Sequence, residues 1–175
     1  MDADLIRMND KFRLADKTIK EGKIGDAVHM LKGIICEMPS FGKAYNHLGW
    51  IFETKFQKRP QAEQYYKKAL ELAPDYPAVY YNYAVLLSLT HQFEKLADLL
   101  NKAWGLPGIN KATIYNEMAI MYEYQQNFDK AIETYKESIK YILDAKGIDA
   151  RLASITRCKR KIGIFGGAHV TDRPK

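Results

Sequence analysis

The sequence predicts an all-α protein, a right-handed α-solenoid of stacked helix-turn-helix repeats. Three observations carry this prediction. Apolar residues recur at helical spacing, in pairs of segments separated by short polar turns. The same sites recur at steps of 34 or 35 residues along the chain. Strand signals are nearly absent, since alternating apolar and polar residues flanked by hairpin dipeptides do not occur.

Each repeat unit holds two matched sites, one on each of its two segments. The site on the first segment is a large residue followed in every unit by a small one: Leu14-Ala15, Leu48-Gly49, Tyr83-Ala84 and Met118-Ala119. The site on the second segment is Ala27, Ala62, Leu96 and Ala131. Small residues here let paired helices approach closely, and no unit could bury its apolar face alone. We therefore expect four stacked helix pairs, in units 8–41, 42–76, 77–111 and 112–145.

The spacing resembles the tetratricopeptide-repeat (TPR) family, whose unit has about 34 residues. The second unit matches the family pattern best, at Tyr45, Leu48, Gly49, Phe52, Ala62, Tyr66, Ala69 and Pro74. The first unit departs at Lys11, where the family has an aromatic residue, and the third at Leu96, where a small residue belongs. The fourth unit lacks the closing proline. The resemblance covers about residues 8–145.

A fifth amphipathic segment follows the four units, at residues 148–162. Leu152, Ile155 and Ile162 share one of its faces. An array that ended at the fourth unit would expose its last apolar face, so we expect this segment to be a capping helix. Residues 1–162 would then form a single TPR domain, and residues 163–175 a flexible basic tail.

The net charge of +6 is concentrated at the C-terminal end. Residues 1–145 hold 19 basic and 19 acidic residues, whereas residues 146–175 hold eight basic and two acidic ones. Five cations form a basic patch on the expected capping helix: Arg151, Arg157, Lys159, Arg160 and Lys161. One interpretation is a solvated cap, and the other is a surface that binds phosphates or an anionic membrane surface.

Composition and motifs exclude several function classes. No apolar run approaches the roughly 18 residues that span a bilayer, and the acidic start is unlike a signal peptide, so we expect a cytoplasmic protein. Cys36 and Cys158 lack paired spacing, and both are expected to be small core residues. No nucleotide-binding loop, nucleophile motif or metal-binding histidine pair occurs. We therefore expect no enzyme, no metal and no cofactor.

The resemblance implies a concave groove lined by the first helix of each unit, at unit positions two, five, nine and twelve. In the first two units these positions are Asn9, Phe12, Asp16, Ile19, Lys43, Asn46, Trp50 and Glu53. In the last two units they are Ala78, Tyr81, Val85, Ser88, Thr113, Asn116, Ile120 and Glu123. This inferred peptide-binding groove mixes amides, aromatic rings and a few carboxylates.

Several groove residues allow two interpretations. Asn46 and Asn116 share one unit position, and each either pairs with the backbone of an extended peptide or ties its own helix to a neighbour. Trp50 and Tyr81 are either anchors for a partner side chain or wedges between helices. Family members that grip an acidic C-terminal tail carry Lys and Asn at positions five and nine of a first unit. Here those positions are Phe12 and Asp16, so that carboxylate clamp is missing.

The leading hypothesis is a non-enzymatic protein-protein interaction module, or scaffold, that holds a partner's peptide or helix in the groove. The alternative is an adaptor that binds nucleic acid or an anionic surface through the basic patch. A third hypothesis is self-association, either through an uncapped end or through a groove that receives the N-terminal segment of another copy. The sequence favours a protein partner, because the body around the tyrosines is neutral rather than basic.

Overall fold

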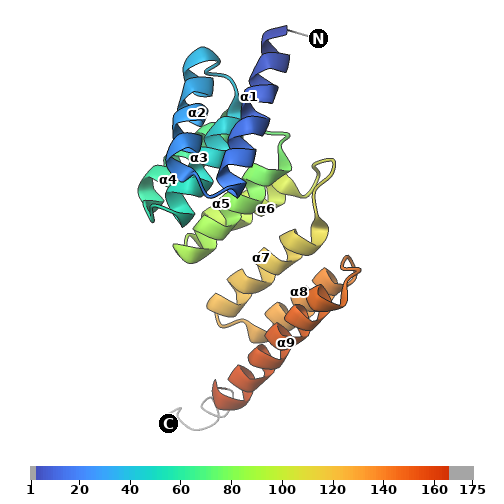
Figure 1. Cartoon of the computed structure of the whole chain (residues 1–175). Helices are drawn as coiled ribbons and strands as arrows, with labels where there is room; N and C mark the ends of the chain where they lie inside the picture. The colour runs from blue at the N-terminus through green and yellow to red at the C-terminus, as the bar shows by residue number, and fades with distance from the viewer. Residues whose placement is uncertain (1–2, 166–175) are drawn as a thin grey trace. The chain divides into compact units, whose positions relative to one another are not determined.

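The computed structural model describes residues 3–165, which form α-helices and no strand (Figure 1). In chain order the helices are α1 (Ala3–Lys20), α2 (Ile24–Glu37), α3 (Gly42–Thr54), α4 (Arg59–Leu72), α5 (Pro77–Leu89), α6 (Phe93–Ala103), α7 (Lys111–Tyr124), α8 (Phe128–Ile139) and α9 (Ala145–Phe165). Four helix pairs and a ninth helix thus follow one another in the predicted order. The expected fold class, all-α with stacked helix-turn-helix repeats, is confirmed.

The chain divides into two compact units, and the boundary lies within α5, between Leu86 and Leu87. The first unit contains α1 to α4 and most of α5. The second contains the end of α5 and α6 to α9. The single domain that the sequence predicts over residues 1–162 stays a prediction, and each compact unit is described by itself below.

The core of the first unit forms where the helix pairs α1/α2 and α3/α4 pack together. The matched small residues Ala15 and Ala27 are fully buried, as the close approach of paired helices requires. Leu48 is also fully buried. At Gly49 a Cβ atom would lie 2.6 Å from the ring of Tyr66, so α3 and α4 approach each other at a distance that only glycine allows.

The turn inside each helix pair has one residue with a left-handed backbone. These residues are Gly22 (φ 78°), Gln57 (φ 54°), His91 (φ 56°) and Gln126 (φ 61°), and they recur at the repeat spacing. In the first and fourth pairs the next residue closes the preceding helix, with Lys23 N–H donating to the Thr18 carbonyl and Asn127 N–H to the Tyr122 carbonyl. This is the usual left-handed termination of a helix, and it fixes where each second helix begins.

In the second unit, α8 packs between α7 and α9. Ala119, Ala131, Tyr135, Ile155 and Cys158 form its buried core. The expected capping helix is longer than predicted, because α9 runs from Ala145 to Phe165 rather than over residues 148–162. Residues 163–165, expected in the tail, are therefore helical, and the remaining tail, 166–175, lies outside the described residues.

The two cysteines differ from each other in burial. Cys158 is buried in the α8–α9 core, as predicted. The same prediction for Cys36 is wrong, because that side chain is exposed. Cys36 lies two residues after the fully buried Ile34, and this offset turns it to the outer side of α2. Among residues 3–165, no helix is long and apolar enough to span a membrane.

Candidate functional site

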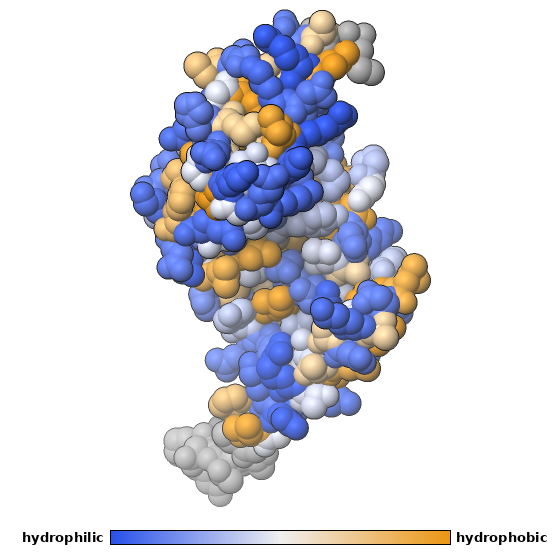
Figure 2. All heavy atoms as spheres, in the orientation of Figure 1, coloured by the Kyte–Doolittle hydropathy of each residue, from blue (hydrophilic) through white to orange (hydrophobic). Residues whose placement is uncertain are grey.

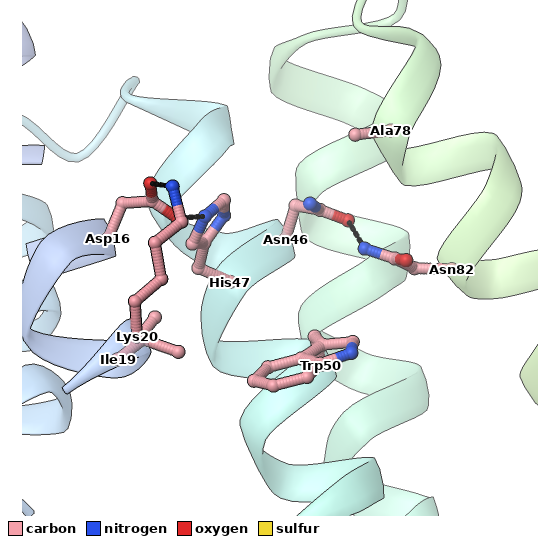
Figure 3. Close-up of a pocket in the computed structure, with 8 residues that line it drawn as sticks. All are labelled: Asp16, Ile19, Lys20, Asn46, His47, Trp50, Ala78 and Asn82. Atoms are coloured by element: carbon pink, nitrogen blue, oxygen red, sulfur yellow. Dashed lines mark hydrogen bonds and ion pairs between the residues drawn. The ribbon is translucent and has the colours of Figure 1, made fainter. Parts of the chain in front are cut away.

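A cavity of about 310 Å³ opens on the first unit, between the first helices of three successive repeats (Figure 3). Its lining residues come from α1, α3 and α5: Asp16, Ile19, Lys20, Asn46, His47, Trp50, Ala78 and Asn82. Five of them are positions that the resemblance assigns to the groove: Asp16, Ile19, Asn46, Trp50 and Ala78. Three consecutive first helices thus contribute predicted groove residues to one concave site.

One wall of the cavity is a polar cluster between α1 and α3. Lys20 Nζ lies 2.7 Å from Asp16 Oδ2, and His47 Nε2 lies 3.4 Å from Asp16 Oδ1. The hydrogen bond from Lys20 lowers the pKa of Asp16, so its carboxylate stays charged. Burial lowers the pKa of His47 despite the nearby Asp16, which favours the neutral imidazole at pH 7. This wall therefore presents one paired carboxylate and one neutral ring.

The opposite wall is a pair of asparagines that links α3 to α5. Asn82 Nδ2 donates a 3.1 Å hydrogen bond to Asn46 Oδ1, and Asn46 is only 1% exposed. Figure 3 shows the two amides facing each other across the gap between the helices. Asn46 therefore ties its own helix to the next repeat, while the half-buried Asn82 lines the cavity.

Trp50, Ile19 and Ala78 supply the apolar part of the lining. Trp50 is half-buried, because it also packs against the core of the first unit, and Lys55 Nζ lies 5.3 Å from its ring centroid. Trp50 thus packs against the helices of the first unit and also faces the cavity, and its role as an anchor for a partner side chain stays a prediction.

The other predicted groove residues of the first unit lie outside the cavity lining. Phe12 is half-buried and its ring packs edge-on against His47, with 4.5 Å between centroids. Lys43 is exposed, and its Nζ lies 5.5 Å from the centre of the Tyr76 ring. On α5, Tyr81 is half-buried and Val85 is exposed.

Glu53, at unit position twelve, is turned toward the second helix of its own repeat. Tyr66 on α4 donates a 2.7 Å hydrogen bond to Glu53 Oε2, and the carboxylate is buried. Burial raises the pKa of Glu53, because it disfavours the charged form. Glu53 therefore joins the two helices of its repeat.

Glu123 has the same unit position in the fourth repeat and the same tyrosine partner, but two cations are added. Tyr135 donates to Glu123 Oε2 at 3.1 Å. Arg157 on α9 approaches both carboxylate oxygens, at 2.7 and 2.8 Å, and Lys161 Nζ lies 2.9 Å from Oε1. Burial alone would raise the pKa of Glu123, but the hydrogen bonds from Arg157 and Lys161 hold it at about 2.

These groups line a second cavity of about 370 Å³, together with Ile120 and Tyr124. The predicted groove residue Asn116 is directed elsewhere, since its Nδ2 donates to Glu117 Oε1 at 3.0 Å. In the second unit, α9 therefore covers the predicted groove side at Glu123.

The basic patch predicted on the capping helix divides into two groups. Arg157 and Lys161 pair with Glu123, and Arg151 Nε donates to Ser138 Oγ at 3.2 Å. Lys159 and Arg160 are exposed. Three of the five cations thus attach α9 to the repeat before it.

Sequence reasoning missed three lining residues of the first cavity: Lys20, His47 and Asn82. A signal for two of them was present, because residues four apart share a helix face. Lys20 follows Asp16 by four residues, and Asn82 follows Ala78 by four. His47 adjoins Asn46 in the chain and carried no such signal.

Comparison with known proteins identifies the fold. Family profiles described as tetratricopeptide repeat match residues 42–76, 65–95 and 112–144. No curated protein sequence gives a significant match.

Among solved structures, pilF of Pseudomonas aeruginosa superposes with a TM-score of 0.80 at 16% identity, over 93% of this chain and 73% of that one. MamA gives a TM-score of 0.71 at 21% identity, over 85% of this chain and 84% of that one. Yeast Tom70 gives 0.76 at 20% identity, over 90% of this chain but only 34% of its own length. The repeat spacing, the helix pairs and these matches agree, and the chain belongs to the tetratricopeptide-repeat family, whose members generally mediate protein-protein interactions.

Proposed function

We propose that this chain is a non-enzymatic interaction module that holds a peptide segment or helix of a partner protein in the concave face of its first unit. The single observation that supports this most is the cavity between α1, α3 and α5, because three repeats contribute to it. Its apolar surface at Ile19, Trp50 and Ala78 suits an apolar anchor side chain of the partner.

The polar groups around this cavity suit the backbone of the partner. Asn46 and Asn82 hold each other in place, and the amide of Asn82 has further hydrogen-bonding capacity toward a peptide group. Asp16 and Lys20 compensate each other's charge, so the site favours a neutral or weakly charged segment. Because stacked helices fix all these groups before binding, the receptor loses little conformational entropy.

An arginine placed in the cavity tests this function. We expect Ala78→Arg to weaken peptide binding at least tenfold, because Ala78 lines the cavity and a long charged side chain there would extend into it from α5. The measurement is fluorescence anisotropy with peptides selected on the wild-type protein from a displayed random library. Gln64→Arg, on the exposed side of α4, is the matched control and should leave affinity unchanged. Equal affinity for all three proteins would place the peptide site elsewhere.

Acidic C-terminal peptides, of the kind that chaperone co-factors grip, should not bind to this site. A terminal carboxylate needs cations that are not already paired with an acid. Unit position nine of the first repeat is instead the acidic Asp16, which forms an ion pair with Lys20. We expect no saturation in a fluorescence titration with such a peptide up to millimolar concentration. Saturable binding at micromolar concentration would contradict this.

A further inference from the structure

Helix α9 has the register of a first helix of the repeat. Leu152-Ala153 lies 34 residues after Met118-Ala119, which is the first-segment site of the fourth repeat. α9 packs along α8, as the first helix of a following repeat would (Figure 1). Among residues 3–165 no helix follows α9, so the fifth repeat is incomplete in the described chain.

The side of α9 where a second helix would pack is exposed. Leu152 is 48% exposed and Ile164 is 71% exposed, and Ala153 is exposed beside Leu152. In the complete repeats the residues that match Ala153 are covered, since Ala119 is fully buried and Gly49 contacts the ring on its second helix. Figure 2 shows hydrophobic surface at the C-terminal end of α9, in the orientation of Figure 1.

The charge of this side identifies the chemistry of its occupant. Lys159 and Arg160 are exposed here, and neither pairs with an acid within the described part of the chain. Asp149 is the only acidic residue of α9. An occupant that covers Leu152 and Ala153 comes close to these two cations, so acidic residues on its flanks would be stabilising.

We propose that the exposed side of α9 binds an acidic amphipathic helix of a partner protein, which completes a fifth repeat as its second helix. The earlier repeats give the pattern of that helix. In α8, Ala131 packs close to α7 and Tyr135 follows four residues later, and Ala62 and Tyr66 repeat this arrangement in α4. The partner helix should therefore carry a small residue and a large one four positions on, flanked by Asp and Glu. This surface is separate from the cavity of the first unit.

The chain itself supplies a defined probe for this surface. The probe is a synthetic peptide with the sequence of residues 127–140, which span α8, in which Lys130, Lys136 and Lys140 are replaced by Glu. Lys130 and Lys136 lie in α8 and Lys140 directly follows it; all three are exposed, so the buried residues of the packing face are unchanged in the peptide. We expect saturable binding by fluorescence anisotropy and a gain in helical circular dichroism, because so short a helix is marginal when free.

Two substitutions on the full chain decide the proposal. Ala153→Tyr blocks the close approach of a second helix, and Lys159→Glu with Arg160→Glu removes the charge complementarity. We expect each to weaken binding of the probe at least tenfold. Lys32→Glu, on the exposed side of α2, is the control and should change affinity less than twofold. Because all these residues are exposed, the variants should keep the circular dichroism of the wild type.

Three results would overturn the proposal. One is equally tight binding of a scrambled peptide of the same composition, which would indicate charge attraction alone. Another is unchanged affinity of the Ala153→Tyr variant for the probe. The third is a concentration-dependent mass in sedimentation equilibrium that Ala153→Tyr abolishes, because a second copy of the chain would then be the occupant.

Discussion

Gly49→Ala is expected to lower the free energy of unfolding by about 2 kcal/mol, although alanine is the better helix former. A Cβ atom at this position meets the Cδ1 and Cε1 atoms of Tyr66 at 2.6 Å. The ring has no free direction to move, since it is fully buried, stacks on Tyr83 with 5.7 Å between centroids, and donates to Glu53. Overpacking costs about 1–3 kcal/mol, and a ring that cannot move places this site at the upper end, about 3 kcal/mol. Subtracting the gain in helix propensity of about 1 kcal/mol leaves a net loss of about 2 kcal/mol.

Gly33→Ala provides the matched control. Gly33 lies inside α2, and no atom lies within 4 Å of the position its Cβ would take. The same substitution should therefore raise the free energy of unfolding here by about 0.5–1 kcal/mol. Urea unfolding followed by circular dichroism measures both variants. If Gly49→Ala stabilised the protein as Gly33→Ala does, the close approach of α3 and α4 would not be a constraint on this fold.

The fold could be predicted from the sequence because its determinants are local and periodic. Ala15, Ala27 and Gly49 mark the close approaches of paired helices, and a single chain displays them at a constant step. The left-handed turn residues are harder to recognise in the sequence. Gln57, His91 and Gln126 have a left-handed backbone although none is a glycine, so only the repeat register identifies them. The error at Cys36 has a similar cause, because residue type suggested burial where the helix phase points outward.

The candidate site could be predicted only in part, because its geometry depends on pairs of residues far apart in the sequence. Asp16, Asn46 and Trp50 were placed on the groove by unit position, and they line the first cavity. Unit position alone does not reveal that Asn82 holds Asn46, or that Tyr66 engages Glu53. The split of the basic patch also depends on such a pair, since Arg157 reaches back 34 residues to Glu123.

Glu123→Gln should lower the free energy of unfolding of the second unit at pH 7 by about 1–2 kcal/mol. Glutamine keeps an oxygen for the Tyr135 hydroxyl but loses the charge that Arg157 and Lys161 share. The difference between an ordinary pKa of 4.5 and the value of about 2 corresponds to at most about 3 kcal/mol. The half-exposed Arg157 side chain is screened by water, which reduces this figure.

The pH dependence of this variant distinguishes ion pairing from simple packing. Because the pKa of Glu123 is lowered in the folded chain, the unfolded chain binds the proton first as the pH falls. The stabilisation by Glu123 is therefore complete above about pH 4.5 and is lost as the pH falls toward 2. The difference in stability between wild type and Glu123→Gln should therefore vanish across that range. It should also shrink in 1 M salt, because part of the pair is exposed to solvent.

Glu53→Gln is the matched control, because Glu53 has the same unit position and the same tyrosine contact without the two cations. Burial raises its pKa, so the folded chain binds the proton more readily than the unfolded chain, and the charged form costs stability at neutral pH. We expect Glu53→Gln to be neutral or slightly stabilising at pH 7. As the pH falls, the wild type should gain stability relative to Glu53→Gln, whereas it loses stability relative to Glu123→Gln. Denaturant unfolding at a series of pH values measures both variants. Parallel pH profiles for the two variants would contradict the role of α9, since only Glu123 has the cations that α9 supplies.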